Sequence, residues 1–201
     1  MTMPPGAPPR PRPQPRTDVT GHKLFFALRP DEAVAERIAC VVAAEHVARG
    51  LAPRLRPARI FHITLHYFGY CEGEPDDALL ARAGEAAAEV VQPAFDVSFD
   101  SFASWGDEQA RKHPFVLTGG EGLQAARQLH EALSERLAAH GLADPEPGRR
   151  YQPHLTLRYD KRPAPAWPVD VAGWFARAFV LVKSPQGLTR HDVIGHWPLR
   201  G

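Results

Sequence analysis

Apolar positions in the first part of the chain change from one spacing to another, which predicts a strand followed by a helix. An apolar run over residues 23–28 has the length of a strand. Apolar residues at helical spacing follow as far as Gly50. Between them stands Pro30-Asp31-Glu32, where proline stops the strand and aspartate can cap the helix. Further along, a strand is expected over 60–68, an Ala-rich helix over 76–91 and a half-buried strand over 94–102.

The second part of the chain repeats this order of elements. We expect a short strand over 114–118, a helix over 122–140 that ends at Gly141, and a strand over 152–159. Two closing strands are expected over 174–182 and 190–197. Each half therefore contains a strand, a helix and a second strand. This repetition predicts a pseudo-symmetric α+β fold built by internal duplication.

The 201 residues are enough for one such domain. Residues 1–20 are rich in proline and arginine and poor in large apolar side chains, so we expect a disordered tail there. The remaining residues, 21–201, should form a single bilobal domain with lobes over about 21–103 and 104–201. The two lobes would share one core.

Composition excludes some classes of protein. A hydrophobic fraction of 44% and a charged fraction of 23% are typical of a soluble globular protein. The sequence has neither a membrane-spanning apolar stretch nor a signal-peptide-like start, so we expect a cytoplasmic protein. The net charge of +1 does not favour a surface that coats polyanions, so any nucleic acid must be bound by a few placed cations. Nothing indicates an obligate protein partner.

One four-residue pattern occurs in the second strand of each half. It reads His62-Ile63-Thr64-Leu65 in the first and His154-Leu155-Thr156-Leu157 in the second. Side chains alternate between the two faces of a strand. The aliphatic residues should therefore pack on the helices, while the opposite faces carry polar residues that line a wet cavity: His62, Thr64 and His66 on one strand, and His154, Thr156 and Arg158 on the other.

Two histidines, each beside a hydroxyl, suit the opening of a cyclic phosphodiester. That reaction needs a water activated on one side of phosphorus and a leaving sugar oxygen protonated on the other, and imidazole does both near neutral pH. The hydroxyls of Thr64 and Thr156 can donate hydrogen bonds to the phosphate oxygens. Arg158, and His66 if charged, would add positive charge. The sequence therefore indicates a phosphodiesterase with a bell-shaped pH profile.

These motifs identify a family resemblance. The chain resembles the 2H phosphoesterase superfamily, and within it the RNA 2′,3′-cyclic phosphodiesterases that are often called 2′-5′ RNA ligases. Five segments between about residues 22 and 200 carry the likeness: residues 23–30, residues 62–69, Gly122-Leu123, residues 153–157 and Trp197-Pro198-Leu199. The likeness is specific because the motifs also keep their order and spacing.

The resemblance implies a bilobal, pseudo-symmetric fold in which two antiparallel sheets flanked by helices enclose a central cleft. It also implies hydrolysis, without a metal or other cofactor, of an RNA terminal 2′,3′-cyclic phosphate, or of a small cyclic nucleotide, to a 2′-phosphomonoester. By match to the motifs, His62 would protonate the departing 3′ oxygen, His154 would activate water, and Thr64 and Thr156 would bind phosphate. The chain departs from the family where a basic residue is usual: His66 follows the first motif, and Tyr159 stands where a cation commonly follows the second.

Two other interpretations differ in class. A zinc site could be drawn from His62, His66, His154 and Cys71, but no CxxC or HExxH spacing supports it. A non-catalytic RNA-binding module would use aromatic residues that stack on bases, for which Tyr67, Phe68, Tyr151 and Tyr159 are the candidates. Within the enzyme class, the same residues suit a 2′-5′ phosphodiesterase, an RNA ligase that runs the reaction backwards, or a phosphodiesterase for another cyclic nucleotide.

The other ionisable residues have no repeated setting. Four cations in loops beside the second motif are candidates for binding RNA phosphates: Arg149, Arg150, Lys161 and Arg162. The remaining histidines are interpreted as surface or structural residues: His22, His46, His113, His130, His140, His191 and His196.

Overall fold

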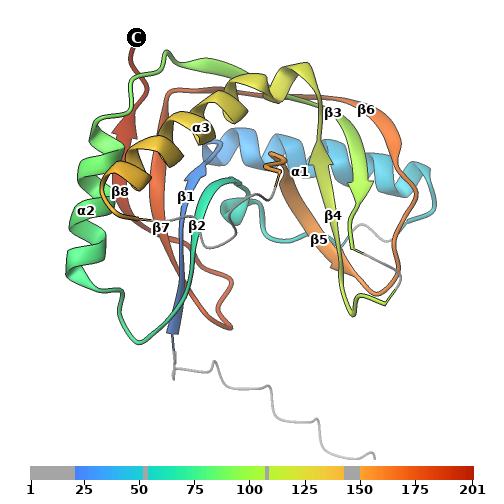
Figure 1. Ribbon diagram of the computed structural model, residues 1–201. Helices are drawn as coiled ribbons and strands as arrows, with labels where there is room; N and C mark the ends of the chain where they lie inside the picture. Colours follow the sequence, from blue (N-terminus) through green and yellow to red (C-terminus); the bar gives the residue numbers. More distant parts are fainter. Residues whose placement is uncertain (1–20, 52–53, 107–108, 143–149) are drawn as a thin grey trace, which may run out of the picture.

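The computed structural model describes residues 21–51, 54–106, 109–142 and 150–201 (Figure 1). The predicted tail over 1–20 and Arg149 lie outside these ranges. In chain order the elements are β1 (Gly21–Leu28), α1 (Glu32–Ala48), the 3-10 helix η1 (Ala58–Ile60), β2 (Ile63–Glu72), α2 (Asp77–Ala88), β3 (Phe95–Ser104), β4 (His113–Thr118), the 3-10 helix η2 (Glu121–Leu123), α3 (Gln124–Ala139), β5 (Leu155–Asp160), β6 (Trp167–Ala176), β7 (Ala178–Pro185) and β8 (Asp192–Pro198). No helix of the described ranges is long and apolar enough to cross a membrane.

Local signals account for where the helices begin and end. The side chain of Asp31 accepts a hydrogen bond of 2.8 Å from the backbone N–H of Val34, so it caps α1 as expected. Helix α3 ends where predicted. Gly141 has a φ of +71°, and the N–H of Leu142 donates to the carbonyl of Leu137 at 2.8 Å. This is the left-handed turn that glycine adopts without strain.

The strands form one antiparallel sheet with the order β6-β3-β4-β5-β2-β1-β7-β8. Its two central strands, β5 and β2, pair only through Ile63 and Leu155. The sheet thus consists of two four-stranded halves joined at one residue pair, each flanked by helices (Figure 1). This arrangement confirms the predicted α+β class, and the two predicted antiparallel sheets are joined into one sheet through this residue pair. The join brings the two motif strands side by side.

The halves of the sheet are not the halves of the sequence. Strand β3 lies with β4, β5 and β6, whereas β7 and β8 lie with β1 and β2. The helices also cross over: α1 follows β1 but contacts β6, and α3 follows β4 but contacts β2. The predicted lobes over 21–103 and 104–201 therefore exchange elements. The strand expected over 174–182 is likewise divided at Arg177, because β6 pairs with β3 in one half and β7 pairs with β1 in the other.

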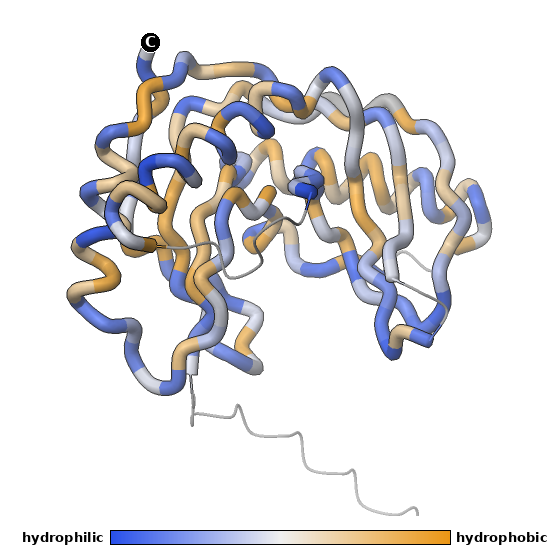
Figure 2. The backbone as a smooth tube through the Cα atoms, viewed as in Figure 1, coloured by the Kyte–Doolittle hydropathy of each residue, from blue (hydrophilic) through white to orange (hydrophobic). Residues whose placement is uncertain are grey.

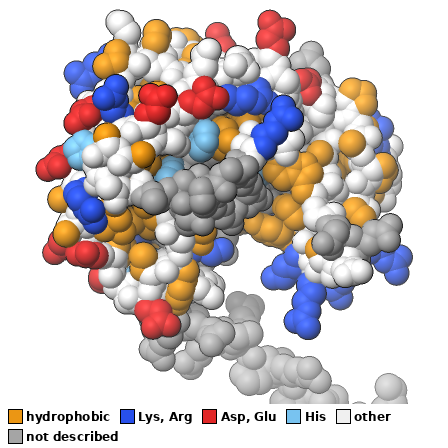
Figure 3. Space-filling model, viewed as in Figure 1, with side chains coloured by type: hydrophobic (Ala, Val, Ile, Leu, Met, Phe, Trp, Pro, Cys, Tyr) orange, Lys and Arg blue, Asp and Glu red, His pale blue; other side chains and the backbone are white. Residues whose placement is uncertain are grey.

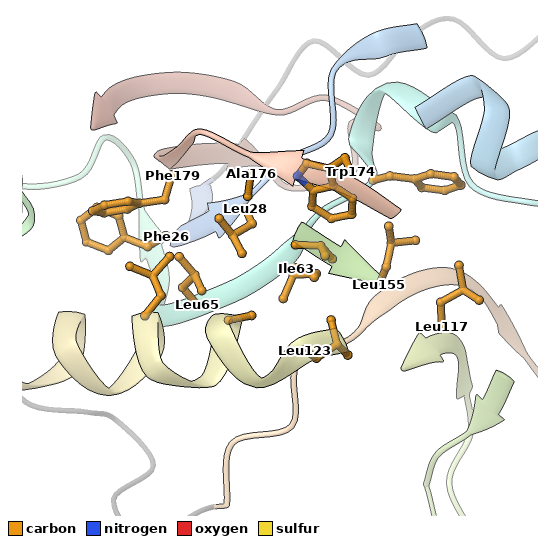
Figure 4. Packing of buried hydrophobic residues seen from close by; sticks show 14 of the residues in the cluster. Phe26, Leu28, Ile63, Leu65, Leu117, Leu123, Leu155, Trp174, Ala176 and Phe179 are labelled. Atoms are coloured by element: carbon orange, nitrogen blue, oxygen red, sulfur yellow. The ribbon is translucent and has the colours of Figure 1, made fainter. Parts of the chain in front are cut away.

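The aliphatic residues of both motifs lie in the main core. Ile63, Leu65, Leu155 and Leu157 are each at most 1% exposed. Figure 4 shows Ile63 and Leu65 pointing from β2 toward the helix that covers it, close to Leu155. Hydrophobic residues follow the strands, and hydrophilic ones follow the outer faces and loops (Figure 2). Burial of such a side chain stabilises a fold by about 1.5–3 kcal/mol. These four residues therefore fix which face of each motif strand is turned away from the core.

Candidate active site

A β-bulge follows the threonine in each motif. In the first, Thr64 pairs with Ala27 and His66 pairs with Phe26, so Leu65 is an extra residue. In the second, Thr156 pairs with Val116 and Arg158 pairs with Phe115, so Leu157 is extra. A bulge inserts one residue into the pairing and thereby changes which later side chains share a face. The tyrosine three residues after each threonine consequently shares the threonine's face.

The motif faces meet around one pocket of about 350 Å³. It is lined by His62, Thr64 and Tyr67 from the first motif and by His154, Thr156 and Tyr159 from the second. The rest of its wall comes from β1, the segment before η1, and the turn between β7 and β8: Lys23, Phe25, Arg56, Ser184, Pro185, Gln186, Gly187, Leu188 and His191. The structure thus brings together both histidines and both threonines, from positions about ninety residues apart in the sequence.

The two motif histidines are held in the same way. Nδ1 of His62 lies 2.8 Å from the carbonyl oxygen of Ile60, and Nδ1 of His154 lies 2.8 Å from that of Gln152. A carbonyl oxygen only accepts, so each Nδ1 carries the proton and donates it. Each ring is therefore fixed by the residue two positions earlier, and proton exchange with a substrate falls to Nε2.

The surroundings of His62 disfavour its charged form. Its ring stacks on Phe25 at 4.9 Å between centroids and meets the edge of His191 at the same distance. Burial, followed by His191, lowers the pKa of His62 to about 3, and Arg56 and His154 act in the same direction. His62 is therefore neutral at pH 7 in the protein without substrate. His154 has a different neighbour, Trp105, whose ring meets it edge-on at 4.4 Å.

Side chains from the second half of the sequence hold the first bulge. The hydroxyl of Tyr151 donates to the carbonyl oxygen of Thr64 at 2.8 Å, and Nδ1 of His130 donates to that of Leu65 at 2.7 Å. The two rings stack on each other at 3.8 Å, and burial raises the pKa of Tyr151. In the second motif, the backbone N–H of Arg56 donates to the carbonyl oxygen of Leu157, the counterpart of Leu65. Tyr151 therefore holds the backbone of the site rather than offering a face to a base.

The bulges also correct the prediction that His66 and Arg158 face the pocket. His66 is 4% exposed, and its ring packs against Phe68 at 4.7 Å. Arg158 lies over the ring of Phe115 at 4.9 Å, and its Nε donates to a carboxylate oxygen of Asp160 at 2.7 Å. Strict alternation predicted the pocket face for both residues, and one extra residue in each strand turns them inward.

The four aromatic candidates for base stacking divide accordingly. Tyr67 and Tyr159 line the pocket and are 39% and 55% exposed. Phe68 is partly buried and packs against the core, with its ring 5.7 Å from that of Phe26. Tyr151 is engaged with the first bulge. Only Tyr67 and Tyr159 of the four offer surface to a ligand in this pocket.

Sequence reasoning missed three ionisable residues of the pocket wall. Arg56 and Lys23 bring positive charge where His66 and Arg158 were expected to do so. Burial lowers the pKa of Arg56, but a guanidinium stays protonated in proteins. His191 was interpreted as a surface or structural residue, yet it contacts His62, and burial lowers its pKa to about 4. None of the three stands in a repeated motif, so the search for duplicated residues had no signal for them.

Other histidines have structural partners. Nδ1 of His22 donates to the carbonyl oxygen of Gly73 at 2.7 Å, and His140 lies 2.9 Å from Glu89. His46 and His113 are at most 1% exposed. Arg150, Lys161 and Arg162 are exposed. In the described ranges, no group of three or more His, Cys, Asp or Glu side chains is arranged to hold a metal ion.

Comparisons with known proteins agree with this geometry. The family model of the 2′-5′ RNA ligase superfamily matches residues 30–180. A curated relative from Thermus thermophilus, named RNA 2′,3′-cyclic phosphodiesterase, is 30% identical over 187 residues, which cover 89% of this chain and 91% of the relative.

Solved structures share the fold. A phosphoesterase structure has a TM-score of 0.67 at 22% identity, and E. coli LigT complexed with 3′-AMP has a TM-score of 0.65 at 22% identity. Each comparison covers 90% of this chain and 99% of the other. The sequence match and the paired motif strands lead to one conclusion: the chain belongs to the 2′-5′ RNA ligase superfamily of 2H phosphoesterases.

Proposed function

We propose that this protein hydrolyses the 2′,3′-cyclic phosphate at the end of an RNA and leaves a 2′-phosphomonoester. The observation that carries the proposal is the pairing of His62 and His154, each fixed through Nδ1, around one pocket that also contains Thr64 and Thr156. The name of the Thermus thermophilus relative supports the choice of substrate.

In the reaction, a water oxygen forms a bond to phosphorus while the bond between phosphorus and the 3′ oxygen breaks. Nε2 of His154 takes a proton from the water, and Nε2 of His62 gives a proton to the 3′ oxygen. The hydroxyls of Thr64 and Thr156 donate to the non-bridging oxygens, where negative charge increases in the transition state. The product is a 2′-phosphomonoester, and proton exchange with solvent restores both rings.

The low pKa of His62 determines how the acid becomes charged. Without substrate, the ring is neutral at pH 7, because its pKa is about 3. A bound cyclic phosphate brings a negative charge beside Nε2, and a neighbouring anion favours the protonated imidazole. The substrate therefore raises the pKa of its own acid. Arg56 and Lys23 offset the remaining negative charge of the phosphate from the pocket wall.

The direct test uses a short RNA that ends in a 2′,3′-cyclic phosphate, with EDTA present throughout. We expect conversion to the 2′-phosphate, which phosphorus NMR distinguishes from the 3′-phosphate. A 3′-phosphate product would contradict the assigned roles of the histidines. Activity that EDTA abolishes and Zn²⁺ restores would favour a zinc site. If the protein binds the RNA without turnover, and if His62→Ala and His154→Ala do not change that binding, the result would favour an RNA-binding module.

Ligation is the second candidate, because the matching family is named for it. It is the same displacement at phosphorus with a 5′ hydroxyl in place of water as the nucleophile: the 5′ oxygen bonds to phosphorus, the bond to the 3′ oxygen breaks, and a 2′-5′ linkage results. Incubation of cyclic-phosphate ends with an excess of 5′-hydroxyl ends measures it directly. A ligation rate above the hydrolysis rate would make the protein a 2′-5′ ligase.

A further inference from the structure

A second cavity of about 470 Å³ adjoins the active-site pocket. Its lining consists of Arg54, Leu55, Arg56, Arg158, Tyr159 and Asp160. Arg56 and Tyr159 line both cavities, so the two cavities adjoin at these side chains. The guanidinium of Arg56 lies 5.8 Å from the centre of the Tyr159 ring, and Tyr159 is 55% exposed. Of the residues that line this cavity, the proposed hydrolysis uses Arg56 alone, so Arg54 has no part in it.

Exposed cations continue from the second cavity along the end of the β4–β5 pair. His113 pairs with Asp160, and the residues beyond this pair on both strands are basic. They are Arg111, Lys112, Lys161 and Arg162, all exposed, and we call these four residues the basic edge. In Figure 3, Lys and Arg side chains gather on the lobe that contains β4 and β5. The full chain has a net charge of only +1, so this concentration of cations is local.

The second cavity lies further along β5 than the active-site pocket, on the way to the basic edge. Thr156 lines the active-site pocket, and Asp160 lines the second cavity four residues further along β5. Because Leu157 is the extra residue of the bulge, Thr156 and Asp160 pair with residues only three positions apart on β4, and their separation is about 10 Å at the rise of a β-strand. Proteins that bind single-stranded nucleic acids typically have grooves in which cationic side chains contact the phosphates and exposed aromatic rings stack on the bases. Of the three arginines that line the cavity, Arg54 is exposed, whereas Arg56 and Arg158 are partly buried. Arg158 also donates a hydrogen bond to Asp160.

We propose that the second cavity and the basic edge bind the phosphodiesters of the nucleotides that precede the cyclic end. The substrate would then be single-stranded RNA rather than a free cyclic mononucleotide. The inference rests on the proposed function, because a 2′,3′-cyclic phosphate uses both the 2′ and 3′ oxygens, and the chain leaves the pocket only through the 5′ oxygen. That chain meets Tyr159 first, then Arg54, then the basic edge.

The test compares two substrates with the same terminal nucleoside: a 2′,3′-cyclic mononucleotide and a pentanucleotide with a 2′,3′-cyclic end. For the wild-type protein, we expect kcat/KM to be about tenfold higher for the pentanucleotide at low salt. Its logarithm should fall with the logarithm of salt concentration by about 0.7 for each bound phosphate. Arg54→Ala and the double variant Lys161→Ala/Arg162→Ala should raise KM for the pentanucleotide and flatten its salt dependence, while the mononucleotide rate stays unchanged.

Arg82→Ala is the matched control. Arg82 is an exposed arginine of α2, which lies by the other half of the sheet, so its loss should alter neither substrate. Equal kcat/KM for the two substrates, or variants that slow both equally, would overturn the inference while leaving the proposed function intact.

Absence of turnover on both substrates would instead defeat the proposed function. The inference is then decided by fluorescence anisotropy with a labelled pentanucleotide that ends in a 3′-phosphate. Weaker binding by the Arg54→Ala and Lys161→Ala/Arg162→Ala variants, with a flatter salt dependence, would support it. Binding equal to that of wild-type would refute it.

Discussion

The two motif strands carry the same pattern of residues but stand in different surroundings. In both, Nδ1 of the histidine is held by the carbonyl two residues earlier, and a bulge follows the threonine. Around His62, however, lie Phe25 and His191, whereas Trp105 meets His154. The first bulge is held by the side chains of Tyr151 and His130, and the second by a backbone N–H.

Two histidines with the same local sequence are therefore not equivalent chemical groups. The backbone bond selects the same tautomer in both rings, which is a local effect. The readiness of each ring to accept a proton depends on burial and on charges contributed by distant segments. A duplicated motif can thereby supply an acid and a base from the same residue type.

The largest effect should come from the histidines themselves. His62→Ala and His154→Ala should each lower kcat on a cyclic-phosphate RNA by about 10² to 10⁴, because each removes one positioned proton transfer. Single-turnover rates measure this loss. A substrate whose 3′ leaving atom is sulfur separates the roles, since a thiolate departs without protonation. His62→Ala should regain activity on it, and His154→Ala should not. The opposite result would exchange the acid and the base.

Acid should destabilise the folded protein through the two histidines His62 and His191 at the first motif. In the folded state, the pKa values of His62 and His191 are about 3 and about 4, below the ordinary 6.5. The unfolded chain therefore binds more protons below pH 6.5, and the free energy of unfolding falls as pH decreases from 6.5 toward 4. Lowering the pKa of one histidine from 6.5 to about 4, as for His191, corresponds to about 3 kcal/mol.

Denaturant unfolding at pH 7 and pH 4.5 measures this effect. His191→Gln should reduce the loss of stability between the two pH values. His196→Gln is the control, because His196 is an exposed histidine of β8. Its replacement should leave the loss of stability between the two pH values unchanged. A loss of stability equal to that of wild-type in the His191→Gln protein would contradict the low pKa of His191.

The pH–rate profiles should show that substrate charges His62. If His62 acts as the acid, activity falls as pH rises through its pKa. The bound anion raises that pKa, so the falling limb of kcat should lie at higher pH than the falling limb of kcat/KM. Because kcat/KM reports the free protein, whose His62 has a pKa of about 3, kcat/KM should already be falling at pH 4, whereas kcat should begin to fall only at a higher pH. Steady-state rates across pH 4–9 compare the two curves. Falling limbs at the same pH would show that the substrate does not alter the protonation of His62.

The smallest expected effect concerns the support of the first bulge. Tyr151→Phe removes one hydrogen bond to the carbonyl oxygen of Thr64 and keeps the ring stacked on His130. A bond of this kind contributes about 0.5–1.5 kcal/mol, so we expect kcat to fall about 2- to 12-fold with little change in KM. Tyr70→Phe is a control, because Tyr70 is an exposed tyrosine at the far end of β2. Equal rates for the Tyr151→Phe and wild-type proteins would show that catalysis does not depend on the hydrogen bond from the Tyr151 hydroxyl.

Much of the fold was predictable because its signals are local. Helix α1 is capped by Asp31, and α3 ends at Gly141, since capping depends on neighbouring backbone groups. The four motif residues could be identified because an alternating strand turns Ile63 and Leu155 to the core and their neighbours to the pocket. The exchange of strands and helices between lobes was not predictable, because no local pattern records which distant strand a segment pairs with.

The two His-x-Thr strands, with aliphatic residues between, could be expected from the residue pattern to present the same polar groups on one face. Their surroundings depend on how distant segments pack. The bulges at Leu65 and Leu157 turned His66 and Arg158 inward, and segments distant in sequence brought Arg56 and His191 to the pocket. The physical reason is range: alternation along a strand depends on adjacent residues, whereas register, burial and charge at a site depend on every segment that packs there.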